Sequence, residues 1–134
     1  MEKIENYIGG ELHKPLSGKY LDNYTPATGK VYSLLPDSDQ KDVQKAVKAA
    51  KEAFPKWSTL SAEKRLGYLM AISLKIEEQI DELALAETKD NGKPLWLSKA
   101  VDIPRAASNF KFYATAMMHD KTDCFEMGDE ALNY

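Results

Sequence analysis

Short apolar runs alternate with turn-forming residues over the first 36 positions, and this pattern predicts β-hairpins. The runs Tyr7-Ile8 and Glu11-Leu12-His13 flank the turn Gly9-Gly10, and the runs 21–25 and 30–35 flank a second turn. The second turn contains a proline, which presets φ, and a glycine, which tolerates a positive φ. We therefore expect two hairpins in this region.

From position 38 onward the spacing of apolar residues becomes helical. Ser38 is expected to cap the first helix, with Asp39 in its first turn. Pro55 is expected to end it, because proline cannot continue the hydrogen-bond ladder. Apolar residues recur at intervals that place them on one face of this helix: Val43, Ala46, Val47, Ala50 and Phe54.

A second helical pattern follows a capping signal at Ser61. The plain interpretation is one helix from 61 to about 90, since no proline and no late glycine interrupts the pattern before Gly92. The charged stretch 77–82 is also compatible with a break between two shorter helices, and the sequence leaves both open. The apolar positions of this pattern are Leu66, Leu69, Met70, Ile76, Ile80 and Leu83.

The segment Asp90–Pro94 predicts a helix stop, because Gly92 accepts a left-handed conformation and the proline prevents continuation. A third helical region is predicted from about Leu95 to Met118. Pro104 should kink this region or restart it with Asp102 as N-cap. The residues available for burial there are Val101, Phe110, Tyr113, Ala114 and Met117.

The predicted fold class is α+β and mostly helical, with N-terminal β-hairpins, three or four helices and a terminal strand. We expect a β-hairpin region over 1–36, a helical region over 37–119 and an extended end over 120–134. In the last of these, Thr122–Met127 looks extended and the final residues look like the start of another strand. The pattern predicts that residues 1–134 form a single incomplete segment.

Composition places the chain among globular proteins and limits its function. Of 134 residues, 43% are hydrophobic and 29% are charged, which argues against disorder. A net charge of -3 without a basic stripe argues against a nucleic-acid platform. The longest apolar run is too short to cross a membrane, and no secretory signal begins the chain. Because the only cysteine is Cys124, we expect a cytoplasmic protein.

The sequence shows no phosphate loop, zinc-protease motif or nucleophile elbow. Cys124 has no activating base in its sequence context, and His13 and His119 have no patterned partner. The acidic pairs Glu77-Glu78 and Asp129-Glu130 are typical of solvated charges. Four aromatic residues at helical spacing indicate a core rather than a stacking platform: Tyr68, Phe110, Phe112 and Tyr113.

Five segments nevertheless resemble, in order and spacing, motifs of the NAD(P)-dependent aldehyde dehydrogenase superfamily. The resemblance extends from about residue 7 to the last residue. Family members usually have Asn where Gly9 and Thr25 stand and an aromatic where Leu12 stands, which affects local turn geometry. The five segments are Tyr7–Glu11, Thr25–Val31, Asp42–Trp57, Glu87–Pro94 and Asp102–Ala114.

The resemblance implies the N-terminal portion of a much longer enzyme, at the start of its cofactor-binding domain. The family's nucleophilic cysteine, general base, oxyanion-hole asparagine and cofactor loop come later, so this chain is expected to hold no catalytic or cofactor-binding residue. NAD(P) belongs to the full-length family. Many members bind a monovalent cation, and the matching positions are the backbone carbonyls of Asn23 and Tyr24 with Asp102. Alternatively, Asp102 caps or flanks the kink at Pro104.

Two functions follow as hypotheses. The first is a structural segment, inactive alone, of an enzyme that oxidises an aldehyde to a carboxylic acid with NAD(P). The second is a non-catalytic assembly module that self-associates or docks on a full-length relative. Apolar stripes without a partner and an open terminal strand favour association, either with the remainder of the enzyme or with itself. Neither nucleic acid nor membrane is an expected partner.

Overall fold

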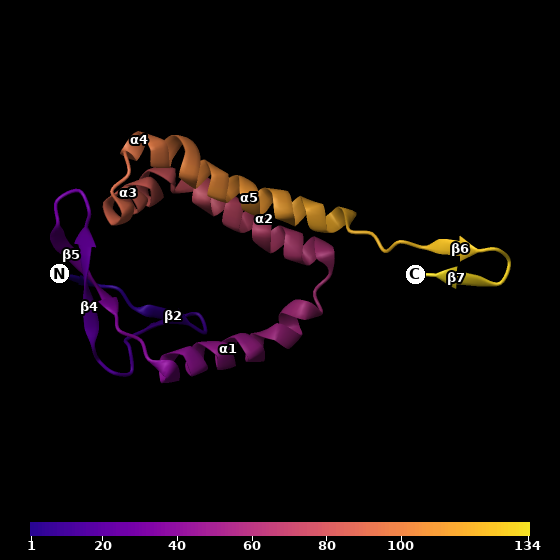
Figure 1. Ribbon diagram of the computed structural model, residues 1–134, viewed down its shortest axis with the longest axis horizontal. Helices are drawn as coiled ribbons and strands as arrows, with labels where there is room; N and C mark the ends of the chain where they lie inside the picture. The colour runs from indigo at the N-terminus through magenta and orange to yellow at the C-terminus, as the bar shows by residue number, and fades with distance from the viewer.

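The computed structural model describes all 134 residues, arranged as strands, then helices, then a projecting hairpin. Figure 1 shows an elongated molecule with a small sheet at one end, two long adjacent helices above a separate one, and the last hairpin at the other end. The N-terminus lies at the sheet, and the C-terminus lies in the projecting hairpin. None of the helices is both long enough and apolar enough to span a lipid bilayer.

Both predicted N-terminal hairpins are confirmed. β2 (Asn6–Ile8) pairs antiparallel with β3 (Glu11–His13), and β4 (Tyr20–Thr25) pairs antiparallel with β5 (Lys30–Pro36). A further strand, β1 (Glu2–Lys3), pairs parallel with β5, which gives a three-stranded sheet of order β1-β5-β4. The sequence did not predict β1, because a two-residue strand carries no periodic signal.

Helix α1 (Gln40–Ser58) begins one residue later than predicted. Its cap is Asp39, whose carboxylate accepts hydrogen bonds from backbone N–H groups of the first turn. The Asp42 carboxylate accepts the Asp39 N–H at 3.1 Å in return, so that a reciprocal capping box forms. The predicted cap, Ser38, is wrong because its hydroxyl instead hydrogen-bonds the side chain of Asn6.

The predicted end of α1 at Pro55 is also wrong, since the helix continues to Ser58. Near a C-terminus, proline removes a single intrahelical hydrogen bond and leaves the last turn intact. The hydroxyl of Thr59 donates to the Pro55 carbonyl at 2.9 Å and satisfies an acceptor of that last turn. A side-chain hydrogen bond thus satisfies one of the terminal carbonyls of the helix.

The pattern over 61–90 forms two helices, α2 (Ala62–Glu78) and α3 (Ile80–Asn91), so the single-helix interpretation is wrong and its alternative is confirmed. The break lies at Gln79, where φ is -113° and ψ is 22°. Ser61 caps α2 as predicted, with its hydroxyl accepting the Lys64 N–H at 3.3 Å. The break directs α2 along α5 and lets α3 reach the β4 edge of the sheet.

The third helical region runs without interruption through a wide turn. It comprises α4 (Leu95–Leu97), the π-helix η1 (Ser98–Asp102), α5 (Ile103–Ala116) and the 3-10 turn η2 (Met117–His119). The π turn directly precedes Pro104, and its wider spacing makes room for a proline ring that has no N–H to donate.

The predicted restart of this region with a capping Asp102 is wrong. Asp102 has a helical backbone, with φ of -69° and ψ of -50°, and its side chain makes no capping hydrogen bond. The stop before this region is confirmed, because Gly92 ends α3 with a left-handed φ of 79°. The carboxylate of Asp102 is instead directed to neighbouring cations, described below.

Small side chains make the tightest helix contact, between α2 and α5. Ser73 of α2 is buried, and its hydroxyl donates to the Ala107 carbonyl of α5 at 2.8 Å. Ala107 and Ala114 are fully buried on the same side of α5. Of the other residues predicted for burial in this region, Val101, Phe110 and Tyr113 are exposed, because only the narrow face toward α2 is covered.

Large apolar side chains are mostly left uncovered. The apolar face of α1, here called the α1 stripe, consists of Val43, Ala46, Val47, Ala50 and Phe54. Of these, Val43 is 57% exposed, Val47 is 47% exposed and Phe54 is 64% exposed. The aromatic residues Tyr68, Phe110, Phe112 and Tyr113 are exposed as well, so their predicted place in a core of this chain is wrong. The buried apolar residues are Ile8, Pro15 and three alanines, so little large apolar surface is removed from water.

The chain ends in an isolated hairpin. β6 (Phe125–Met127) pairs antiparallel with β7 (Ala131–Asn133), and every residue of both strands is exposed. The end of the chain therefore forms two strands, where the sequence predicted one terminal strand. As Figure 1 shows, an extended segment separates this hairpin from the helices.

The α2–α5 contact generates a stability prediction. Replacing Ser73 with leucine should overpack the contact and lower the free energy of unfolding by about 1–3 kcal/mol. The matched control Ser58→Leu changes an exposed serine at the end of α1 and should stay within about 0.5 kcal/mol of the parent. Urea denaturation followed by circular dichroism measures both, and equal losses would contradict the assigned close contact.

Candidate functional site

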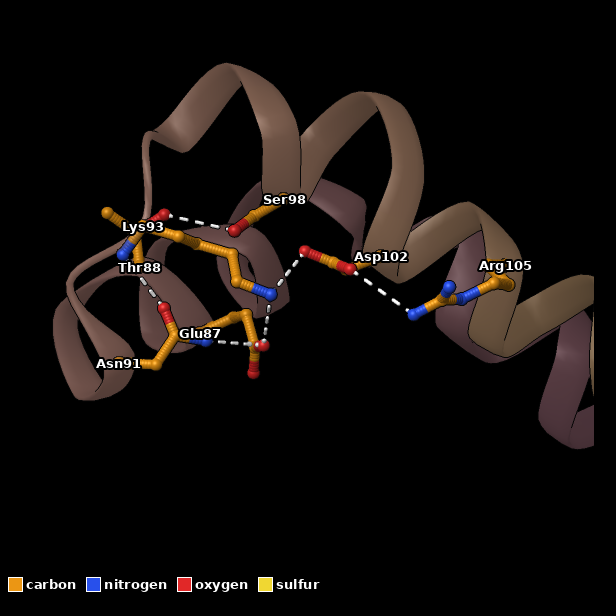
Figure 2. A network of polar contacts seen from close by, with 7 residues as sticks. All are labelled: Glu87, Thr88, Asn91, Lys93, Ser98, Asp102 and Arg105. Carbon is orange, nitrogen blue, oxygen red and sulfur yellow. Dashed lines mark hydrogen bonds and ion pairs between the residues drawn. The ribbon is translucent and has the colours of Figure 1, made fainter.

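A network of charged side chains surrounds Lys93, in the turn between α3 and α4. The Lys93 ammonium lies 2.7 Å from Asp102 Oδ2 and 3.3 Å from Glu87 Oε1. Arg105 Nη2 lies 3.5 Å from the other oxygen of Asp102, so that this carboxylate faces two cations. Figure 2 shows Lys93 between the two carboxylates, with Glu87 on α3 and Asp102 at the end of η1.

Hydrogen bonds fix the turn around this lysine. Asn91 Nδ2 donates to Glu87 Oε1 at 2.6 Å, and Asn91 Oδ1 accepts the backbone N–H of Lys93 at 2.9 Å. The hydroxyl of Thr88 donates to the Ser98 hydroxyl at 3.2 Å, which links α3 to η1 (Figure 2). The network therefore joins the end of α3 to the π turn at several points.

A second polar cluster joins α3 to the sheet. The Tyr32 hydroxyl donates to Asp90 Oδ1 at 2.7 Å, and Asn23 Nδ2 donates to the same oxygen at 3.2 Å. The β4–β5 register slips at this point, since Asn23 pairs with Ser33 and the next residue pairs with Val31. This bulge leaves Tyr32 outside the regular pairing, in a position from which it reaches the carboxylate of α3.

The acid–base properties of both clusters favour fixed charges. The hydrogen bond to Asp102 raises the pKa of Lys93 above its usual value, against a smaller opposing effect of burial. Hydrogen bonds from Tyr32 and Asn23 lower the pKa of Asp90, and the same contact with Asp90 raises the pKa of Tyr32. Efficient proton transfer near neutral pH needs a pKa near 7. All three shifts move away from that value, so these groups are suited to holding structure.

Two turns from distant parts of the chain meet beside these clusters. A Cβ added to Gly92 would lie 3.0 Å from Pro26 Cβ, so that the α3 stop and the β4–β5 turn are in close contact. Gly92 also has a positive φ, a conformation that glycine adopts with little cost. These turns belong to two of the five segments that resemble family motifs. The contact explains physically why a glycine stands at 92.

Two of the three predicted cation ligands line clefts. Asn23 lines an open cleft of about 690 Å³ between the sheet and α3, while Asp102 lines a neighbouring cleft of about 370 Å³. The Asp102 carboxylate forms ion pairs with Lys93 and Arg105. The cation site on Asn23, Tyr24 and Asp102 stays a prediction.

The candidate catalytic residues also remain separate. Cys124 is exposed in the segment before β6, and His13 lies on β3, in the hairpin with β2. His13 Nε2 lies 3.9 Å from Glu11, a partner on its own strand. No group of three or more His, Cys, Asp or Glu side chains is placed to hold a metal ion. The acidic pairs Glu77-Glu78 and Asp129-Glu130 are exposed, in agreement with their reading as solvated charges.

The two polar clusters were not predicted from the sequence. Lys93 and Asp90 stand in the segment Glu87–Pro94, which resembles a family motif but gave these two residues no expected role. Tyr32 gave no signal at all, because its role depends on the strand bulge and on a helix 58 positions later. Spacing along the chain carries no information on such a contact.

Comparison with known proteins identifies the family. The model of the aldehyde dehydrogenase family matches residues 13–134. The chain belongs to the aldehyde dehydrogenase family. It is 45% identical over 132 residues to 2-aminomuconic semialdehyde dehydrogenase of Danio rerio, with 98% of this chain and 27% of that protein covered. The resemblance noted in the sequence is therefore confirmed.

Solved aldehyde dehydrogenases contain a segment of the same shape. An indole-3-acetaldehyde dehydrogenase of P. syringae, in complex with NAD+, matches with a TM-score of 0.87 and 31% identity over 93% of this chain and 26% of that chain. An aldehyde dehydrogenase of Bacillus cereus matches with a TM-score of 0.91 and 30% identity over 98% and 27%. The chain thus spans about a quarter of the length of the relatives it matches.

The contact between the two turns generates a second prediction. Gly92→Ala should cost about 1–2 kcal/mol for the left-handed backbone and a further 1–3 kcal/mol, approximately, for the collision with Pro26. Gly29→Ala is the matched control, since Gly29 has a φ of +65° and open space around it. Urea denaturation of both variants separates the two effects. Equal losses would show that the turns do not touch.

The Asp90 cluster generates a third prediction, on pH dependence. Because the folded pKa of Asp90 lies below the unfolded value of 3.8, its stabilisation is present above that pH and is lost as the pH falls below it. Tyr32→Phe removes the main cause of the lowered pKa of Asp90. The variant should therefore lose less of its free energy of unfolding as the pH falls. Tyr7→Phe, at an exposed tyrosine of β2, should leave it unchanged. Urea midpoints measured across the acid range test this, and an unaltered slope in Tyr32→Phe would contradict it.

Proposed function

We propose that this chain is the N-terminal structural segment of an aldehyde dehydrogenase and has no activity by itself. The observation that carries the proposal is a segment that matches solved family members in fold yet leaves its large apolar side chains exposed. A segment of this kind completes its hydrophobic core when further polypeptide packs against its exposed apolar side chains. In the parent reaction an aldehyde is oxidised to a carboxylic acid while NAD(P)+ is reduced.

Within that enzyme, the role of this segment is to begin the cofactor-binding domain and to hold its own turns in place. The Lys93 and Asp90 clusters support this role, because their charges connect α3 to η1 and to the sheet. Neither cluster has the acid–base properties of a proton donor or acceptor for catalysis. The NAD(P) site itself belongs to the longer enzyme, as does assembly into an oligomer.

A cytoplasmic location belongs to the same proposal. The one cysteine, Cys124, is exposed and free, which fits a reducing compartment. The second candidate function, an assembly module that docks on a full-length relative or on itself, draws its support from the exposed α1 stripe. The two functions share one surface and differ in the partner that covers it.

The proposal predicts that the purified chain does not turn over. Mixed with an aldehyde and NAD+ or NADP+, it should give no absorbance of reduced nicotinamide above the buffer control. A full-length aldehyde dehydrogenase under the same conditions shows that the assay works. Reduced nicotinamide formed by this chain, in proportion to its concentration, would overturn the inactivity claim.

A further inference from the structure

The total exposed surface of the chain is too large for a self-contained protein. It amounts to 10360 Å² for 15.1 kDa. A compact monomer of this mass exposes about 7,100 Å². The excess of roughly 3,300 Å² is several times the ~800 Å² that each partner contributes to a stable complex. This surface is therefore large enough for an extensive interface with a partner.

The α1 stripe is the most clearly defined part of that surface. The hairpin β2–β3 lies against the alanine side of α1, where Gly9 approaches Ala49. Val43 and Val47 face a different direction, along an open groove that Lys48 and Lys51 border. Figure 1 shows most of α1 apart from the α2–α5 pair, although the ring of Trp57 near its end lies 5.8 Å from that of Tyr68 of α2. Helix α1 also contacts β2. Ala46 and Ala50 of the stripe line the hollow between α1 and the β2–β3 hairpin, whereas Val43, Val47 and Phe54 remain exposed on this 19-residue helix.

The excess exposed area indicates how large the partner is. A helix of 19 residues is about 28 Å long and its face about 10 Å wide, so a self-dimer through α1 alone would cover on the order of 300 Å² per copy. That leaves most of the excess exposed. Solved relatives hold a segment of this shape within a chain about four times longer, with TM-scores near 0.9. The large excess surface and the match in shape both favour a large partner of that kind.

We infer that this chain binds the remaining three-quarters of an aldehyde dehydrogenase as a separate molecule, with the α1 stripe as a main contact. The inference rests on the proposed function and adds that no peptide bond between the two parts is needed for their association. The stripe meets apolar side chains of the remainder, while Lys45 on the opposite side of α1 stays in water. A second copy of this chain is the competing occupant.

A cleavable fusion tests the inference. In the fusion, this chain replaces the matched 27% of the Danio rerio enzyme. A protease site is placed at the junction between the two parts. After cleavage, we expect both pieces to co-elute in gel filtration with one-to-one stoichiometry. Val47→Asp and Phe54→Asp place a charge in the contact and should weaken binding tenfold or more. Lys45→Asp, on the other side of α1, is the matched control and should leave binding unchanged.

Each other outcome overturns the inference. Pieces that separate after cleavage show that the covalent connection is required, and variants that all bind equally show that the stripe is not the contact. Light scattering on the isolated chain provides a measurement that does not depend on the fusion. A stoichiometric self-dimer, disrupted by the same two stripe variants, would identify a second copy as the occupant. These experiments measure binding and test only the inference. Turnover by the isolated chain is a separate result, and it would overturn the proposed function.

Discussion

The close approach of α2 and α5 is the interaction on which the arrangement of the helices depends. The two backbones can approach because the side chains between them are small: Ser73, Ala107 and Ala114. The Ser73 hydroxyl donates a hydrogen bond to the facing carbonyl of Ala107. The contact contributes little hydrophobic free energy, because so few carbon atoms are buried in it. The arrangement of these helices therefore depends more on close fit and hydrogen bonding than on the amount of apolar surface removed from water.

Charged groups connect the helical part of the chain to the sheet. Lys93 connects α3 to the π turn through Glu87 and Asp102, and Asp90 connects α3 to β5 through Tyr32. Such partly exposed pairs are individually weak, but several of them act on one short turn. The same turn touches Pro26, so that polar bonding and steric fit reinforce one another there. The segments that resemble family motifs thus meet in space at a structural junction.

Local signals in the sequence predicted the elements well, and long-range contacts account for what they missed. Both hairpins and the left-handed Gly92 follow from turn chemistry, which depends on a few adjacent residues. The π turn before Pro104 and the role of Tyr32 depend on neighbours that spacing does not reveal. Burial was the weakest prediction, since periodicity gives the apolar face of a helix but not what covers it. For Phe110 and Tyr113 this chain supplies no cover.

The parallel pairing of β1 with β5 has a consequence for biosynthesis. Glu2 and Lys3 precede their strand partners, Ser33 and Leu34, along the chain, so they are translated before those partners exist. β1 therefore stays unpaired while about thirty further residues are translated, and the β1–β5 edge of the sheet forms only once β5 is available.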